Sequence, residues 1–248
     1  LFEPLEDRRL LACEIFVEKA TQTLFVRGDE GNNKIAVVGR SDELLVTCDG
    51  SFTRVPSGDI DDIQVKGGKG NDTLSAAEIA AALHLFGDDG DDSVTYDVNG
   101  DGFVQPTDVI GGGGHDTIAI NATDLADIIK RLGPGNRVSP DPEITVSNTA
   151  GAELAHLFVQ ETEGITVNTL AGNDDVTMRD DDNLLGDIEW TVDLGVGHNR
   201  FDALSTRLTG DQSLLLRIDT MAAGNDRGNF DLPPEVHDEV LDALEHGD

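Results

Sequence analysis

The sequence is poor in aromatic and basic residues. Aromatic side chains make up 4% of the 248 residues, with one Trp (Trp190) and one Tyr (Tyr96). The stacking platforms of proteins that bind sugars or single-stranded nucleic acids are therefore scarce. Seventeen Lys and Arg residues against 49 Asp and Glu residues give a net charge of -32. This balance argues against nucleic acid and anionic membranes as partners and favours cations or basic surfaces.

Cysteines and long apolar runs are also few. The two cysteines, Cys13 and Cys48, leave two possibilities open, one bridge between neighbouring early strands or two buried thiols. No run approaches the ~18 apolar residues of a membrane helix, so membrane insertion is not expected. Glycine is abundant, with 28 residues, and much of the aspartate lies beside it. Such strings are typical of turn-rich β proteins, and 38% apolar residues suffice for a core.

A nine-residue frame recurs along the chain. Its seven copies are "GGKGNDTLS" (67–75), "GDEGNNKIA" (28–36), "GDDGDDSVT" (87–95), "GGGGHDTIA" (111–119) and the weaker segments 169–177, 194–202 and 221–229. Position four is always Gly, position six is Asn or Asp, and position eight is apolar in all copies but the last. Each copy therefore predicts a turn, a short polar side chain and then a buried strand.

Position five of the frame is always Asn, Asp or His. These residue types tolerate positive φ better than other non-glycine residues, so the backbone is predicted to reverse there. His115 and His198 occupy this position, and we interpret them as turn formers rather than transition-metal ligands. The other four histidines share no spacing with each other or with cysteine, which argues against a zinc site.

The frame resembles the nonapeptide G-G-x-G-x-D-x-U-x of the calcium-binding repeats-in-toxin proteins. That resemblance implies stacked turns with calcium between them, held by aspartate carboxylates and turn carbonyls. Calcium takes six to eight oxygen ligands, and glycine lets carbonyls crowd one ion. The metal ligands expected from the frame are Asp72, Asp92, Asp116, Asp174 and Asp226, with the turn glycines Gly68, Gly70, Gly90, Gly112 and Gly114. The alternative is a stack of Gly-Asn-Asp turns held by side-chain hydrogen bonds without metal.

The fold class that follows is all-β: a right-handed parallel β-helix or β-roll-like solenoid with one frame turn per coil. Short strands are predicted in the segments "TLFVRG", "KIAVVG", "ELLVTC", "IDDIQVKGG", "EITVSN", "ITVNTL", "EWTVDLG" and "SLLLRID". The 39 residues between the first two copies are expected to hold an extra coil without the frame. Parallel strands stack about 4.8 Å apart, so successive acidic turns would repel without a cation.

A second calcium signal is "DVNGDGFVQPTD" (97–108), which is similar to the loop of EF-hands and dockerin domains. The resemblance implies calcium ligands at Asp97, Asn99, Asp101, Phe103 (through its carbonyl) and Asp108. No second loop follows, so cohesin binding is not expected. We interpret the loop as a calcium-organised insertion, with an acidic surface turn as the alternative.

The ends of the chain have their own signals. "FEPLEDRRLLA" (2–12) resembles the LEPR-x-LL-type motif of planctomycete secreted and surface proteins, which implies export and display at the cell surface. Residues 1–20 are assigned to this motif and a first-coil cap, and residues 21–231 to the solenoid. The acidic segment 232–248 contains "EVHDEVLDALEH" and is predicted to be a helix that caps the last coil or docks a partner.

Residues 122–142 interrupt the repeat. "ATDLADIIKRL" (122–132) reads as a short helix and "GPGNRVSPDP" as a linker, so the solenoid is either one stack with a bulging loop or two blocks. We favour one continuous stack.

The motifs of common enzyme classes are missing from the sequence. It contains no G-x-S-x-G, no H-E-x-x-H, no phosphate loop and no basic cluster for an acidic sugar. The sequence therefore favours a non-catalytic, extracellular calcium-binding structural module. The alternatives are calcium-dependent adhesion or self-assembly, with other surface proteins or with itself, and a β-helix protein that binds or processes polysaccharides.

Overall fold

The computed structural model of the chain describes residues 13–100, 105–132, 142–180, 188–205, 216–219 and 227–231. The predicted C-terminal helix in 232–248, the N-terminal motif in 2–12 and the candidate ligands Asp101, Phe103 and Asp226 lie outside these residues. The fold is all-β. Among the described residues the one helical element is a 3-10 turn, η1 (Ser57–Asp59).

The strands form two sheets. Sheet A has eleven strands in the order β1 (Cys13–Glu18), β2 (Thr23–Gly28), β6 (Asp62–Lys69), β8 (Ala82–Asp89), β10 (Pro106–Gly113), β14 (Glu153–Gln160), β13 (Glu143–Asn148), β12 (Asp127–Leu132), β16 (Asp175–Asp180), β18 (Arg200–Ser205) and β20 (Arg227–Asp231). Sheet B has nine strands in the order β19 (Leu216–Asp219), β17 (Glu189–Asp193), β15 (Gly164–Asn168), β11 (Thr117–Asn121), β9 (Ser93–Asp97), β7 (Thr73–Ala77), β3 (Lys34–Gly39), β4 (Glu43–Cys48) and β5 (Ser51–Pro56).

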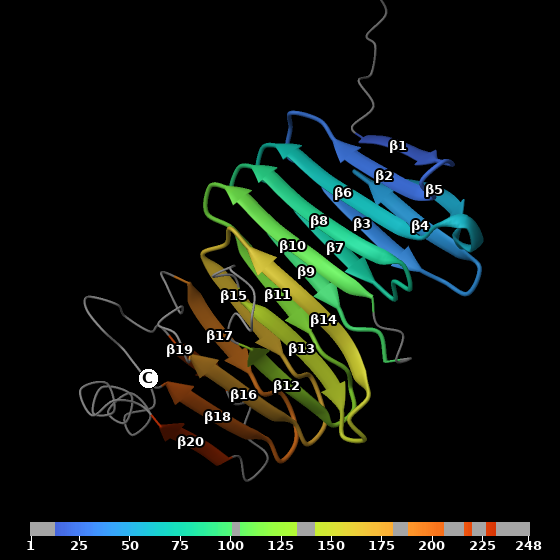
Figure 1. Cartoon of the computed structure of the whole chain (residues 1–248). Coiled ribbons are helices and arrows are strands. Elements are labelled where there is room, and N and C mark those ends of the chain that lie inside the picture. The colour runs from blue at the N-terminus through green and yellow to red at the C-terminus, as the bar shows by residue number, and fades with distance from the viewer. Residues whose placement is uncertain are drawn as a thin grey trace, which may run out of the picture.

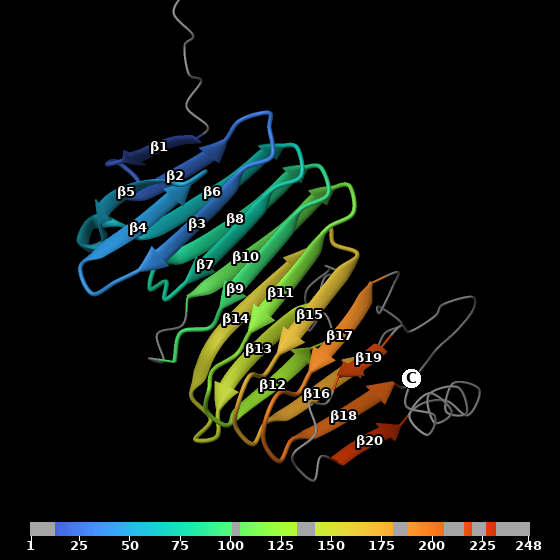
Figure 2. The ribbon, with the colours of Figure 1, turned by 180° about the vertical axis from the view of Figure 1, so that it is seen from behind.

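The chain alternates between the two sheets as it advances along one axis. Figure 1 shows this progression from the N-terminal strands to β18 and β20, and Figure 2 shows the same strands from behind. Neighbouring strands of the alternating segments are parallel, as β6 with β8 and β7 with β9. This arrangement is consistent with the predicted β-solenoid. Four of the predicted strands match β2, β3, β4 and β13 residue for residue.

Two regions depart from the parallel pattern. Near the N-terminus, β1 pairs antiparallel with β2, and β4 and β5 extend sheet B as antiparallel strands beside β3. The long first interval thus holds an antiparallel meander, and the predicted extra coil is wrong. In sheet A, β13 runs antiparallel to both of its neighbours, β12 and β14, whereas β14 is parallel to β10 and β12 is parallel to β16. After β11 the chain passes to β12, which leaves room for two strands between β10 and β12 in sheet A. The next strands, β13 and β14, fill that space in reverse order.

The predicted helix in 122–132 is wrong, because this segment forms a turn and then β12. Its apolar residues fit both the 3.6-residue period of a helix and the two-residue period of a strand. Every second side chain of β12 is buried: Asp127, Ile129 and Arg131. The side chains between them, Ile128 and Lys130, are not buried. This is the period of two that a strand requires. Pairing with β13 and β16 decides between the two periods.

The core lies between the sheets. Inward side chains share one register across neighbouring strands, as Leu24, Ile63 and Leu83 do in sheet A. Leu74, Val94 and Ile118 form the corresponding row in sheet B. A single cluster of buried side chains runs from Leu24 to Phe201. The inserted strands therefore belong to the same core as the strands before them.

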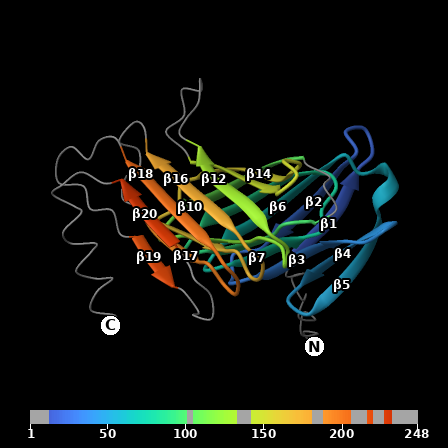
Figure 3. The same cartoon turned by 90° about the horizontal axis from the view of Figure 1, so that it is seen from below.

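A disulfide joins the two sheets at the N-terminal end. Cys13 in β1 is bonded to Cys48 in β4, with 6.2 Å between their Cα atoms. Of the two possibilities left by the sequence, the bridge is the one found. Figure 3 shows β1 and β2 at the same end as β4 and β5. Across the described residues no helix is long and apolar enough to span a membrane.

Candidate functional site

The copies of the frame lie on two different edges of the molecule. The turns at 28–36, 67–75, 87–95 and 111–119 lead from a strand of sheet A to a strand of sheet B, and we call their side the first edge. The turns at 169–177 and 194–202 lead from sheet B back to sheet A, and their side is the second edge. Because the strands within each sheet are parallel here, these are opposite edges. The antiparallel insertion separates the two sets.

The backbone reverses at positions two and four of the frame. On the first edge Gly68, Asp88 and Gly112 at position two have φ of 107°, 73° and 115°, and Gly70 and Gly90 at position four have φ of 106° and 137°. The prediction of positive φ at position five is wrong. Asn and His tolerate that conformation, but glycine adopts it at lower cost and lies next to them.

Position five instead forms a hydrogen-bonded column that we call the outer ladder. The Asn71 N–H donates to Asn32 Oδ1 (2.9 Å), the Asp91 N–H to Asn71 Oδ1 (3.1 Å) and the His115 N–H to Asp91 Oδ1 (3.0 Å). On the second edge the His198 N–H donates to Asn173 Oδ1 (2.9 Å). His115 and His198 thus extend the ladder through their backbone, as residues of the turn.

Position six forms a second column, the inner ladder, in which the bonds run the other way along the chain. The Asn33 N–H donates to Asp72 Oδ1 (2.7 Å), the Asp72 N–H to Asp92 Oδ1 (2.7 Å) and the Asp92 N–H to Asp116 Oδ1 (2.8 Å). The Asp116 N–H then donates to Glu163 Oε2 (2.7 Å). These turn amides, which would otherwise be buried without partners, are thus satisfied by the next turn along the stack.

The second edge has an inner ladder of its own. The Asp127 N–H donates to Asp174 Oδ1 (2.8 Å), and the Asp174 N–H donates to Asn199 Oδ1 (2.9 Å). Sequence reasoning missed Asp127, because the segment 122–130 lacks every glycine of the frame. A weaker signal was present, since Asp127 and Ile129 stand at positions six and eight.

Glu163 was also missed by sequence reasoning. It lies in the connection from β14 to β15, outside any copy of the frame. The longer Glu side chain supplies the acceptor that an aspartate at position six supplies in the other turns. A period search cannot find such a residue, because its backbone does not follow the frame.

Each aspartate of the inner ladders has one carboxylate oxygen without a partner. These atoms are buried and make no hydrogen bond: Oδ2 of Asp72, Asp92, Asp116 and Asp174, and Oδ1 of Asp127. The side chains themselves are almost completely buried, with exposures of 0% to 2%. A buried ionised oxygen without a hydrogen bond is costly, so each site calls for a proton or a cation.

On the first edge the unpaired oxygens lie against glycine at position one. A Cβ on Gly67 would lie 2.3 Å from Asp72 Oδ2 and 2.5 Å from the Gly87 carbonyl oxygen. A Cβ on Gly87 would lie 2.4 Å from Asp92 Oδ2 and 2.3 Å from the Gly111 carbonyl oxygen. Glycine thus leaves a cradle into which a carboxylate oxygen and a carbonyl oxygen both project.

Burial raises the pKa of the ladder carboxyls. The pKa of Asp72 is raised to about 6, mainly by desolvation and further by the neighbouring Asp92, while the hydrogen bond from the Asn33 N–H opposes the rise. Desolvation also raises the pKa of Asp92 and Asp116. On the second edge, the pKa of Asp174 is raised to about 6 by desolvation, against the hydrogen bond from the Asp127 N–H. The fold therefore disfavours the bare ionised carboxylates.

The chemistry of the first edge fits calcium. The cradles offer carboxylate and carbonyl oxygens, the donors that calcium prefers. No three His, Cys, Asp or Glu side chains converge as a metal group anywhere in the described part of the chain. An ion at these turns would therefore combine the carboxylates of Asp72, Asp92 and Asp116 with backbone carbonyls. The carbonyl oxygens in these cradles belong to Gly87 and Gly111, which were not among the glycines predicted as ligands.

The turn glycines also allow the copies to stack closely. A Cβ on Gly90 would lie 1.9 Å from the Gly70 oxygen, and one on Gly114 would lie 2.1 Å from the Gly90 oxygen. The Gly70 and Gly90 amides donate to Asp89 and Gly113 of the following copy, at 2.9 and 2.7 Å. The N–H groups are thus used for stacking, and the position-four carbonyls face the next copy.

The structure does not bring the two ends of the predicted EF-hand-type loop together at one site. Asp97 ends β9 in sheet B, and its Oδ1 accepts a hydrogen bond from Asn121 Nδ2 (2.6 Å). Asp108 lies in β10 of sheet A and faces His84. Asn99 follows β9 in the connection between them.

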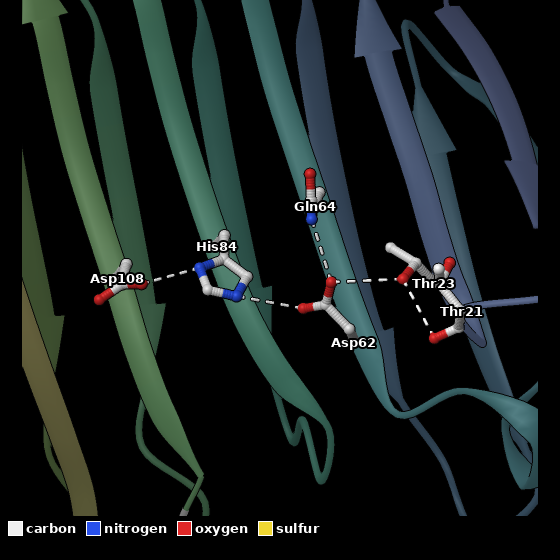
Figure 4. A network of polar contacts seen from close by, with 6 residues as sticks. All are labelled: Thr21, Thr23, Asp62, Gln64, His84 and Asp108. Atoms are coloured by element: carbon white, nitrogen blue, oxygen red, sulfur yellow. Dashed lines mark hydrogen bonds and ion pairs between the residues drawn. The ribbon is translucent and has the colours of Figure 1, made fainter. Parts of the chain in front are cut away.

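Asp108 belongs to a polar network on the outer face of sheet A (Figure 4). His84 lies between two carboxylates, with Nδ1 2.8 Å from Asp108 Oδ2 and Nε2 3.1 Å from Asp62 Oδ1. The other oxygen of Asp62 accepts hydrogen bonds from Gln64 Nε2 (3.0 Å) and Thr23 Oγ1 (3.4 Å). The two carboxylates bind opposite sides of the imidazole ring, so the three groups do not converge on one point. The network ties β2, β6, β8 and β10 together.

Comparisons with known proteins found no match among family models, curated proteins or solved structures.

Proposed function

We propose that the chain is a non-catalytic structural module of an exported protein, a β-solenoid whose first-edge turns bind calcium. The observation that carries the proposal is the row of buried carboxylate oxygens without partners at Asp72, Asp92 and Asp116. Calcium would neutralise this row and link successive copies of the frame. Ions that bind the stacked turns and not the unfolded chain add directly to the stability of the fold.

Export is supported by the disulfide between Cys13 and Cys48. Such bonds persist in oxidising compartments and are rare in the cytosol of most organisms. Extracellular calcium-binding modules bind the ion with dissociation constants of roughly 10⁻⁴ to 10⁻³ M. A chain with this affinity would gain its ions, and part of its stability, after leaving the cell.

A structural role also accounts for the acidic residues that stand out in the sequence. Asp72, Asp92 and Asp116 each accept a backbone N–H from the preceding copy, so the turns use them for stacking. The outer face of sheet A carries His84 between two carboxylates that hold both ring nitrogens. In this arrangement both ring nitrogens are used in contacts between strands of the sheet.

The test is thermal unfolding of metal-stripped protein with calcium added, and with magnesium as the control. Calcium should raise the melting temperature, and magnesium should do so less, because it requires a tighter octahedral shell and keeps its waters. The double variant Asp72→Asn with Asp92→Asn should lose most of the response. An equal melting temperature in chelator and in millimolar calcium would overturn the proposal.

A further inference from the structure

The second edge also buries carboxylates, although its turns lack the glycine at position one of the calcium frame. Asp127 is 0% exposed and Asp174 is 2% exposed. They lie in successive turns of the stack, because the Asp127 N–H donates to Asp174 Oδ1 at 2.8 Å. Two acidic side chains are thus held next to each other, out of contact with water.

Each of these carboxylates has one satisfied and one unsatisfied oxygen. Asp127 Oδ2 accepts hydrogen bonds from the Thr123 N–H (2.8 Å) and the Thr123 hydroxyl (2.7 Å). Asp127 Oδ1 and Asp174 Oδ2 are buried without a hydrogen-bond partner. The Thr169 hydroxyl hydrogen-bonds to Asp174 and lowers its pKa, but it also lies 2.7 Å from the Leu194 carbonyl oxygen. Its one proton cannot serve both acceptors.

Asn199 indicates what the unsatisfied position requires. It occupies position six in the next turn of the same ladder, and its Oδ1 accepts the Asp174 N–H, the same role that Asp174 Oδ1 plays for Asp127. The Asn199 amide nitrogen then donates to the Leu194 carbonyl oxygen. At Asn199 the second atom of the position-six side chain therefore faces a carbonyl oxygen. An amide satisfies that oxygen, whereas a carboxylate places a second electron-rich atom beside it.

Within the described residues, the ion pairs nearest to this pair join Arg200 to Asp175 and Asp202, and no cation is paired with Asp127 or Asp174. The negative charge of Asp127 itself contributes to the raised pKa of Asp174. Arg131, the buried cation of β12, lies with Cζ 5.7 Å from the centre of the Trp190 ring.

We propose that Asp127 and Asp174 form a second cation site, specific for a hard divalent ion such as calcium, on the edge opposite to the glycine-rich turns. The two carboxylates and the backbone carbonyls of the turns at 122–127 and 169–174 are its ligands. The choice of calcium as the probe ion rests on the proposed function, whereas the residues and the edge are different.

The experiment counts bound calcium by equilibrium dialysis of the full chain. The double variant Asp127→Asn with Asp174→Asn should bind fewer ions per chain than the wild type. Asp124→Asn, which removes the same charge from an exposed position of the same turn, should bind as many ions as the wild type. Asp72→Asn with Asp92→Asn reports on the first edge in the same assay.

The outcomes separate the two proposals. If the second-edge double variant keeps the full count while the first-edge variant loses ions, the second site is overturned and the proposed function stands. If the wild type binds no calcium, both proposals fail. Should the double variant not fold, Asn199→Asp provides the converse test. It replaces the amide by a carboxylate beside Asp174, so it should add calcium capacity, and an unchanged count would contradict the site.

Discussion

The two edges of the molecule build the same inner ladder from different turns. On the first edge position one is glycine in every described copy, and the unpaired carboxylate oxygens lie against it. On the second edge Ala122, Thr169 and Leu194 occupy position one, and all three are buried. The ladder itself therefore requires only a carboxylate or amide at position six. Glycine at position one adds an open cradle, in which the second carboxylate oxygen lies close to the carbonyl oxygen of the next copy.

The edges also differ in what they present to solvent. The first edge exposes glycine, aspartate and asparagine. On the second edge Leu125, Leu170 and Val196 are 67%, 41% and 58% exposed. Leu170 has a φ of 65°, a conformation that costs a leucine roughly 1–2 kcal/mol. The second edge thus keeps the hydrogen bonds of the frame while it abandons the residue types that suit its backbone.

Adding a methyl group to the first-edge cradle should have the largest effect. Gly67→Ala places a Cβ within 2.5 Å of Asp72 Oδ2 and of the Gly87 carbonyl oxygen. We expect a loss of about 3 kcal/mol in the free energy of unfolding, measured by urea denaturation. Gly58→Ala is the matched control, because no atom lies within 4 Å of its added Cβ. Equal losses in the two variants would mean that the cradle is not tightly packed.

The end of the first inner ladder should be the next most sensitive point. Glu163→Ala removes the acceptor of the buried Asp116 N–H, so we expect a loss of about 2 kcal/mol. Glu163→Gln keeps an acceptor oxygen and should restore most of that loss. Glu189→Ala, at an exposed position of β17, should change stability little. A Gln variant as unstable as the Ala variant would contradict the hydrogen-bonding role.

The metal-free protein should lose stability as the pH rises. The raised pKa values of Asp72 and Asp174, both about 6, mean that the fold prefers the protonated carboxyls. Their contribution is complete below the unfolded pKa of about 4 and is lost as the pH rises through about 6. Melting temperatures in chelator between pH 4.5 and 7.5 measure this decline. Asp72→Asn should flatten the first-edge part and Asp174→Asn the second-edge part.

The smallest expected effect concerns the backbone of the second edge. Leu170→Asn replaces a leucine in the left-handed conformation by a residue that tolerates it, and should add about 0.5–1 kcal/mol of stability. Leu125→Asn is the control, because Leu125 is exposed but has no positive φ. A gain in both variants would point to reduced apolar exposure rather than to the backbone.

Much of the fold could be predicted from the sequence, because position eight and the alternating strands encode burial directly. The residues of the inner ladder at Asp72, Asp92, Asp116 and Asp174 were found through the frame. The outer ladder was misassigned to positive φ, since Asn and His suit both a left-handed turn and a side-chain acceptor. Only the neighbouring copy, stacked above, decides between those uses.

The sequence did not predict that the copies of the frame lie on two opposite edges. A copy of the frame does not state which sheet precedes it, so 111–119 and 169–177 look alike although they lie on opposite sides. Asp127 was hidden because Ile128, Ile129 and the surrounding residues also fit a helix. Its place in the ladder depends on pairing with β13 and β16, far along the chain.

The most direct measurement is a crystal structure of the protein grown in calcium, with anomalous scattering recorded to locate the ions. The account predicts anomalous peaks within coordination distance of the unpaired oxygens of Asp72, Asp92 and Asp116. Turns without peaks, with each of these oxygens at hydrogen-bond distance from a carbonyl oxygen, would contradict it. In that case the ladder holds protons, and the stacked turns are structural without metal.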